Sequence, residues 1–155
     1  MKNFTSKMDK KTGLMTTSFV VFAVAVPFVM YKLGAPRVSL FMVSLIMALA
    51  FITSYMMIPQ LFLNDKTIVI KNNFVNIKIP FDDINTIEEN PKIGLNIRTM
   101  GVGGLFGHFG YFNGNDVWYV TNIHNKVKIT MKSGKIYMIS PENPEEFIKK
   151  VKNFS

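Results

Sequence analysis

Two long stretches without charge dominate the first 64 residues of the chain. Residues 13–31 form a run of 19 uncharged, mostly apolar positions, and residues 38–64 form a second such run. Nineteen helical residues at ~1.5 Å rise each span roughly the ~30 Å hydrocarbon core of a bilayer. Pro59 would end or kink a helix, so the second span is expected over 38–58. The connection at 32–37 contains glycine and proline, and the whole pattern predicts a transmembrane helical hairpin.

Three other kinds of segment produce apolar runs, and each fits less well. A cleaved signal peptide has an apolar stretch of about 7–15 residues and a small-residue cleavage site. The first run is longer, has no convincing site of that kind before Pro36, and is followed by a second run. A buried hairpin of a soluble protein would need more cover than the remaining 91 residues supply. An interfacial helix needs a polar face, which neither run has.

After residue 64 the pattern changes to short alternating or β-branched segments. Turn signals such as Asn72-Asn73 and Ser133-Gly134 separate these segments. They predict about seven short strands, at 66–71, 74–81, 84–88, 96–100, 117–121, 126–131 and 135–140.

The last residues return to a helical period. Asn143 suits an N-cap, Pro144 the first helical position, and Glu146 the third. We therefore expect an α+β chain. An N-terminal two-helix transmembrane hairpin precedes an antiparallel β-barrel or sandwich of about seven strands, and a C-terminal helix caps the strands.

This layout resembles the membrane-anchored bacterial PH-like domain proteins. The matching segments are FVNIKIPFDDINTIE, Arg98 with the glycines after it, WYVT at 118–121, and KIYMISPENPEEFI near the end. The resemblance covers roughly residues 64–152 and implies two packed antiparallel sheets with a capping helix. It implies no particular ligand, because a fold alone does not give a function. The expected parts are a basic tail over 1–12, the hairpin over 13–63 and a PH-like domain over 64–155.

The charge distribution gives the hairpin a direction. The net charge is +8, and the side of the two termini carries seven basic residues near the spans: Lys2, Lys7, Lys10, Lys11, Lys66, Lys71 and Lys78. The connection carries only Lys32 and Arg37. The positive-inside rule therefore predicts that both termini lie in the cytoplasm. Together with the resemblance to bacterial proteins, this implies a multi-pass protein of the bacterial inner membrane. The residues expected to flank the lipid bilayer are Lys10, Lys11, Lys32, Arg37 and Lys66.

The rest of the chain is close to neutral, which argues against a nucleic-acid partner. Residues 65–155 hold 12 basic and 9 acidic side chains. A surface that binds the phosphate backbone needs a much larger positive excess. The overall basicity is therefore an orientation signal, and no nucleic-acid binding is expected.

Residues 101–114, GVGGLFGHFGYFNG, hold six of the ten glycines. Phe106, Phe109, Tyr111 and Phe112 alternate with them. One hypothesis is a loop or bulged strand pair that contacts lipid headgroups or a partner through these aromatics. The other, which we favour, is that the aromatics belong to the core and the glycines permit bends in curved strands. The spacing does not match a G-x-G-x-x-G nucleotide loop.

Three basic side chains are further candidates for ligand contact. Arg98 is the only arginine after the hairpin and could bind a phosphate or carboxylate through two hydrogen bonds. A structural ion pair with Glu88 or Asp116 is the favoured alternative. Lys126 and Lys128 could belong to a basic rim for an anionic headgroup, although such lysines more often form a solvated strand face or protect an edge.

The case for an enzyme or a metal site is poor. The chain has no cysteine, which excludes thiolate chemistry. His108 and His124 are the only histidines, and they show no metal-ligand spacing. The acidic pairs at 82–83 and 88–89 are adjacent residues that point to opposite faces of a strand. We expect no enzyme, no cofactor and no metal.

These observations favour a non-catalytic, membrane-tethered PH-like binding or scaffold module at the cytoplasmic face. Its ligand would be a protein partner, a lipid headgroup or another copy of the chain. The alternative is a small accessory subunit of a membrane transport or secretion complex, in which the hairpin is the specific binding element.

Overall fold

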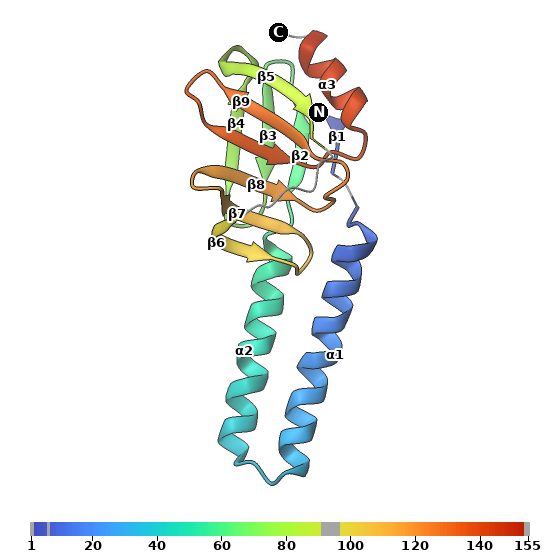
Figure 1. The fold of residues 1–155 in the computed structure, drawn as a ribbon, viewed down its shortest axis with the longest axis vertical. Helices are drawn as coiled ribbons and strands as arrows, with labels where there is room; N and C mark the ends of the chain where they lie inside the picture. The colour runs from blue at the N-terminus through green and yellow to red at the C-terminus, as the bar shows by residue number, and fades with distance from the viewer. Residues whose placement is uncertain (1, 6, 91–96, 154–155) are drawn as a thin grey trace.

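The computed structural model describes residues 2–5, 7–90 and 97–153. Two long helices project from one end of a β domain, and a short helix covers the domain at its other end (Figure 1). The long helices are α1 (Lys10–Lys32) and α2 (Arg37–Met56), and the short one is α3 (Pro144–Asn153). The predicted pair of N-terminal apolar helices and the predicted C-terminal helix are confirmed.

Helices α1 and α2 form an antiparallel hairpin (Figure 1). Most of its large apolar side chains are exposed. Both are long and apolar enough to cross a membrane. The residues that are buried on them are hydroxyl residues: Thr12, Thr16 and Ser54. Helix α1 begins three residues before the uncharged run because Asp9 caps it, and α2 ends before Pro59 as expected.

The described strands form two sheets. The first is antiparallel and has the order β1 (Lys2–Asn3), β2 (Gln60–Leu63), β3 (Thr67–Lys71) and β4 (Asn76–Pro80). The second has the order β5-β9-β10-β8-β7-β6. Its strands are β5 (Ile84–Glu89), β6 (Arg98–Gly103), β7 (His108–Phe112), β8 (Asp116–Val120), β9 (Val127–Met131) and β10 (Ile136–Ile139). The expected antiparallel pairing holds in this sheet except between β8 and β10, which are parallel.

Of the two expected architectures, barrel and sandwich, the protein has the sandwich. Among the described strands, no pairing joins the two sheets. The chain leaves the first sheet at Pro80, which has no N–H for a further ladder bond. A short 3-10 turn, η1 (Phe81–Asp83), then carries it to β5, and the Phe81 side chain is buried between the layers.

Three strands, β1, β2 and β7, add to the seven that the sequence predicts. Strand β2 lies at the end of the second uncharged run, where its apolar residues continue the hydrophobic helix without a change of composition. Strand β7 lies in the glycine-rich segment and contains Gly110. Strand β1 precedes α1, far in sequence from the strand with which it pairs.

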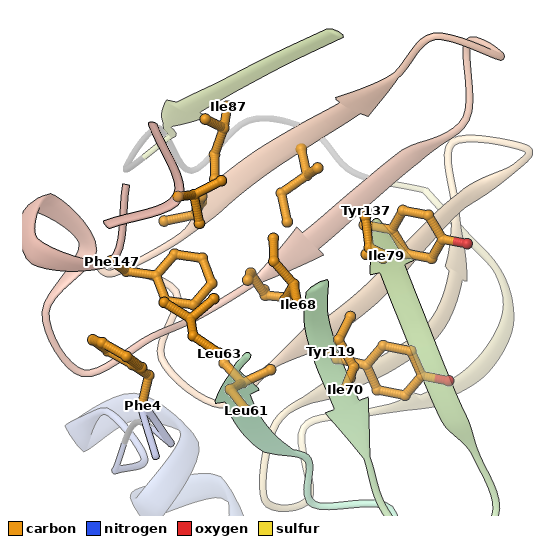
Figure 2. Packing of buried hydrophobic residues seen from close by; sticks show 14 of the residues in the cluster. Phe4, Leu61, Leu63, Ile68, Ile70, Ile79, Ile87, Tyr119, Tyr137 and Phe147 are labelled. Carbon is orange, nitrogen blue, oxygen red and sulfur yellow. The ribbon is translucent and has the colours of Figure 1, made fainter. Parts of the chain in front are cut away.

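The main core lies between the sheets and is closed at one end by α3 (Figure 2). Phe147 of α3 is fully buried and meets the ring of Phe4 edge to face, with 5.2 Å between the ring centroids. The predicted cap of α3 is confirmed, because Asn143 Oδ1 accepts a hydrogen bond from the Glu146 N–H at 3.1 Å. A second, smaller cluster consists of Phe112, Trp118, Val120, Ile123 and Met138.

Candidate functional site

The most distinctive site is the junction where the hairpin meets the β domain, and its first component is the N-terminal segment. This segment is built into the domain before α1 begins. Asn3 pairs with Phe62 of β2, and the Phe4 N–H donates to the Leu61 carbonyl at 2.8 Å. Phe4 is 3% exposed within the main core. The domain therefore holds the chain on both sides of the hairpin, through β1 before α1 and β2 after α2.

Asp9 fastens the start of α1 to the second sheet. Its carboxylate accepts from the Thr12 N–H at 2.8 Å, as an N-cap does, and from the Ile123 N–H at 3.0 Å. Burial of Asp9 raises the pKa of its carboxyl, but the hydrogen bonds from Thr12 and Ile123 outweigh this effect and hold the pKa below the usual 3.8. Asp9 is therefore charged at neutral pH, and one side chain satisfies both the helix end and the loop after β8.

The turn between β6 and β7 fits between the two helices. The Phe106 N–H donates to Thr16 Oγ1 of α1 at 3.0 Å. The Phe106 ring packs edge-on against Phe51 and Tyr55 of α2, with centroid distances of 5.1 and 5.5 Å. One residue thus touches both helices, and it does so in a left-handed backbone conformation with φ 59°.

Two glycines explain why this part of the chain is so rich in that residue. Gly101 and Gly110 lie directly opposite each other on β6 and β7, and each has φ 122°. A Cβ on Gly101 would lie 2.8 Å from the Gly110 Cα and would clash with the Phe109 carbonyl. Glycine is needed here for close approach of the two strands as well as for the positive φ.

A third contact joins the turn between β3 and β4 to the end of α2. The Asn73 N–H donates to the Met56 carbonyl at 3.3 Å, and Asn72 Nδ2 donates to the Met57 carbonyl at 3.0 Å. Carbonyls at a helix C-terminus have no partner within the helix, so these donors satisfy groups that would otherwise need water. The base of the hairpin is thus held by Asp9, by the β6–β7 turn and by the β3–β4 turn.

The four aromatic residues singled out from the glycine-rich segment do not share one surface. Phe106, Phe109 and Phe112 are buried, whereas Tyr111 is 44% exposed. Phe109 belongs to the main core and Phe106 to the junction. Phe112 belongs to the smaller cluster, where it stacks on Trp118 at 4.4 Å between ring centroids.

The three basic candidates also lie in different settings. Lys126 is only 3% exposed, its Nζ lies 5.2 Å from the centre of the Trp118 ring, and burial lowers its pKa. Lys128 pairs across strands with Glu88 at 3.6 Å. Arg98 is exposed, and its guanidinium approaches the Gly103 carbonyl at 3.5 Å.

His108 links two of these basic residues electrostatically. Burial of the ring lowers its pKa, the Asp9 carboxylate acts in the opposite direction, and the positive charges of Arg98, Lys11 and Lys126 lower it further. His108 is therefore a neutral side chain at neutral pH. Asp9 itself was not a sequence candidate, although an Asp three residues before Thr12 at the start of an apolar run is an N-cap signal.

The predicted membrane-flanking residues are all exposed: Lys10, Lys11, Lys32, Arg37 and Lys66. The first four lie at the ends of α1 and α2. Lys66 lies in the turn between β2 and β3, at the end of β2 that points away from α2. Lys71 is the lysine nearer the helix, because it pairs with Gln60 at the start of β2.

No metal-binding cluster accompanies the junction in the described part of the chain. Across residues 2–5, 7–90 and 97–153, no three His, Asp or Glu side chains are grouped so that they could hold a metal ion. The hydrogen bonds and ring contacts of the junction are structural ones. They hold the two helices against the sheets.

Comparison with known sequences identifies the β domain. A family model described as bacterial PH domain matches residues 59–154. This segment starts just before β2 and includes α3, so it covers more than half of the chain but omits the hairpin and β1. No curated protein and no solved structure matches the chain.

Proposed function

This chain belongs to the bacterial PH domain family, and we propose that it is a non-catalytic binding module held at the cytoplasmic face of the bacterial inner membrane by its hairpin. Domains of the PH type are generally binding modules without catalysis, which supports the first part of the proposal. The two apolar helices support association with a membrane.

The observation that carries the proposal is that strands of the domain flank the hairpin in sequence on both sides. Strand β1, before α1, and strand β2, after α2, are neighbours in one sheet. Both helices therefore leave from the same end of the domain (Figure 1). A pair of spans rooted in one folded domain crosses the bilayer and returns, so both termini lie on one side. The excess of lysine near those termini favours the cytoplasmic side.

A protein partner, including another copy of the chain, is the ligand that we favour over a single lipid headgroup. A headgroup site needs converging basic side chains that remain accessible. Lys126 is buried beside Trp118, and Lys128 is paired with Glu88 on a strand face. Of the three candidates, Arg98 alone is an exposed side chain. One exposed arginine is a weak basis for headgroup specificity.

Cysteine accessibility in intact cells tests the orientation cleanly, because the natural chain contains no cysteine. Leu33→Cys places a thiol in the exposed connection between the helices, and Lys149→Cys places one on the exposed face of α3. A membrane-impermeant maleimide should label position 33 in spheroplasts and position 149 only after permeabilisation. The reverse pattern would exclude the cytoplasmic orientation, and labelling of both positions in intact spheroplasts would exclude a spanning hairpin.

Purification of the tagged full chain in mild detergent tests the binding role. We expect a partner protein or a second, differently tagged copy to be recovered in constant proportion. The matched control is the same domain with an unrelated two-span hairpin that keeps residues 2–16 and 51–57, so that the junction is preserved. If the natural chain yields neither a partner nor a copy, the proposed module loses its main support.

The accessory-subunit alternative has one specific observation in its favour. An apolar groove of about 250 Å³ runs between the helices and includes the small residues Ala23, Ser44 and Ala48. Small residues allow close approach of another membrane helix. In this alternative, the hairpin exchange just described would abolish partner recovery, whereas a module that binds through its β domain would retain its partner.

A further inference from the structure

The β domain keeps a few large apolar side chains on its surface. Among the described residues outside the hairpin, 10–56, these are Met8, Phe74, Ile97, Met100 and Tyr111, with exposed fractions of 42%, 56%, 67%, 71% and 44%. We call this set the apolar rim. Scattered exposed apolar residues need no explanation, but a set gathered in one region does.

Four of the five rim residues, all except Ile97, lie on elements at the base of the hairpin. Met8 directly precedes the cap of α1. Phe74 lies in the β3–β4 turn, which is hydrogen-bonded to the end of α2. Met100 and Tyr111 are directly opposite each other on β6 and β7. Figure 1 shows these two strands at the end of the domain from which the helices leave.

The length of the helices sets the depth of this end of the domain. The hydrocarbon core of ~30 Å corresponds to about 20 helical residues. Counted back from the connection after Lys32, about 20 residues of α1 reach the region of Gly13. Met15 and Thr16 are thus close to the near boundary of the hydrocarbon, and Thr16 holds the β6–β7 turn. The turn therefore lies at the boundary between hydrocarbon and headgroups, and the two strands that it joins lie next to this boundary.

The backbone of β6 fits the headgroup region better than the hydrocarbon. Strand β6 is an edge strand that pairs only with β7 among the described strands. Its outer N–H and C=O groups need water or headgroup oxygens as partners, and hydrocarbon supplies neither. Amphipathic surfaces commonly insert to about 5–10 Å, at the boundary between headgroups and acyl chains.

The basic residues around the rim favour anionic lipid. Lys10 and Lys11 are exposed at the start of α1, Lys71 is exposed at the end of β3, and Arg98 is exposed on β6. Basic residues beside an apolar surface favour an anionic leaflet, at ~1 kcal/mol for each charge near the surface. A second copy of the chain would bring the same positive charge to the rim, so this surface suits anionic lipid better than self-association, which would have to use another face.

We propose that the apolar rim seats the β domain on an anionic membrane surface, with Phe74 and Met100 inserted at the headgroup–acyl boundary. This proposal rests on the proposed function, because it requires the hairpin to span the bilayer. It assigns the lipid contact to rim residues, in place of the buried phenylalanines of the glycine-rich segment. The domain is thereby fixed in height and tilt above the membrane.

Depth-dependent quenching tests the rim on the full chain in nanodiscs that contain anionic lipid. Single-cysteine variants Phe74→Cys and Met100→Cys carry an environment-sensitive thiol label, and quenching is compared between lipids brominated near the headgroup and near the chain end. Val24→Cys, exposed in the middle of α1, is the control for spanning, and Lys149→Cys on α3 is the control for water. Retained tryptophan fluorescence shows that each variant folds.

We expect labels at positions 74 and 100 to be quenched several-fold more than the label at 149, and most strongly by the shallow bromines. Quenching at 24 together with water-like behaviour at 74 and 100 would overturn the rim while leaving the spanning hairpin intact. Absence of quenching at 24 would overturn the hairpin and the rim together. If unlabelled chain, and not lipid, changes the signals at 74 and 100, the rim binds another copy and the proposal is wrong.

Discussion

The hairpin exposes most of its large apolar side chains, whereas the β domain buries residues of the same types in its core. On the hairpin, side chains such as Val24 and Phe28 are 69% and 60% exposed, and the residues that are buried carry hydroxyl groups. In the β domain, Phe109 and Phe147 are 0% exposed. Outward apolar surface of this extent is unfavourable in water and favourable in lipid. The hairpin surface therefore suits lipid and the surface of the β domain suits water, and the junction lies where these two kinds of surface meet.

The largest difference in stability between the two regions is expected when a phenylalanine ring is removed from each. Phe109→Ala should lower the free energy of unfolding of the β domain by about 3–5 kcal/mol, because it removes a fully buried ring and leaves a cavity. Phe28→Ala should change the stability of the domain very little, since that ring contacts the surroundings of the hairpin. Denaturant unfolding in mild detergent, followed by the single tryptophan, measures both. Equal losses would mean that the hairpin is a packed core element of the domain.

The next largest effect should come from a residue that lies before the hairpin in sequence but inside the domain in space. Phe4→Ala should destabilise the β domain by about 3 kcal/mol, because Phe4 packs on Phe147 and is almost fully buried. Phe22→Ala on α1, where the ring is 55% exposed, is the matched control. A negligible change for Phe4→Ala would show that the domain is complete without β1.

The regions also differ in how well the sequence predicts them. The hairpin is readable because a membrane-spanning helix needs about 20 consecutive, predominantly apolar residues. Strands β4 and β9 are readable because apolar and polar positions alternate along them. Strands β3 and β10 are short apolar runs next to turn signals, and their successive residues are buried. Strand β2 is not readable, because its composition continues that of α2. Strand β1 is not readable, because it pairs with a strand that is distant in sequence, Lys2 with Leu63 and Asn3 with Phe62, and such pairing leaves no local signal.

The candidate site was harder to predict than the fold. Burial decided the role of most candidates, and burial depends on tertiary packing. Phe106 contacts both helices of the hairpin. This role depends on where the fold places Thr16, and the residues next to Phe106 in sequence do not reveal it. Asp9 gave a local cap signal, but its second partner, Ile123, is 114 residues away. Lys126 looked like a surface lysine and instead covers Trp118.

The junction itself can be probed through Asp9. Asp9→Ala should cost about 1–2 kcal/mol at neutral pH, because it removes an N-cap and leaves the Ile123 N–H without its acceptor. The pKa of Asp9 is lowered in the folded protein, so the unfolded chain binds the proton more readily. Its contribution is therefore fully present above the unfolded value of about 3.8 and is lost as the pH falls through the lower folded value.

Acid titration of stability separates this charge effect from simple capping. The stability difference between the natural chain and Asp9→Ala should narrow as the pH drops below 3.8. Asp9→Asn keeps a capping oxygen but cannot ionise, so its stability should lack this component of the pH dependence. A difference between the natural chain and Asp9→Ala that does not change on acidification would mean that the carboxylate charge contributes nothing to the junction.

The smallest effect should come from Lys128, which the sequence offered as a ligand contact and the fold places beside Glu88. The pair is partly exposed, with N and O atoms 3.6 Å apart, and such pairs contribute about 0–1 kcal/mol. Lys128→Ala, Glu88→Ala and the double variant, compared at low and high salt, should give a coupling energy of a few tenths of a kcal/mol that salt weakens. A coupling that is salt-independent and well above this range would make the pair a buried structural element. The expected stability change is so small that it could not by itself reduce binding. A marked loss of partner recovery by Lys128→Ala would therefore indicate that the partner is recognised through this face of the β domain and not through the hairpin.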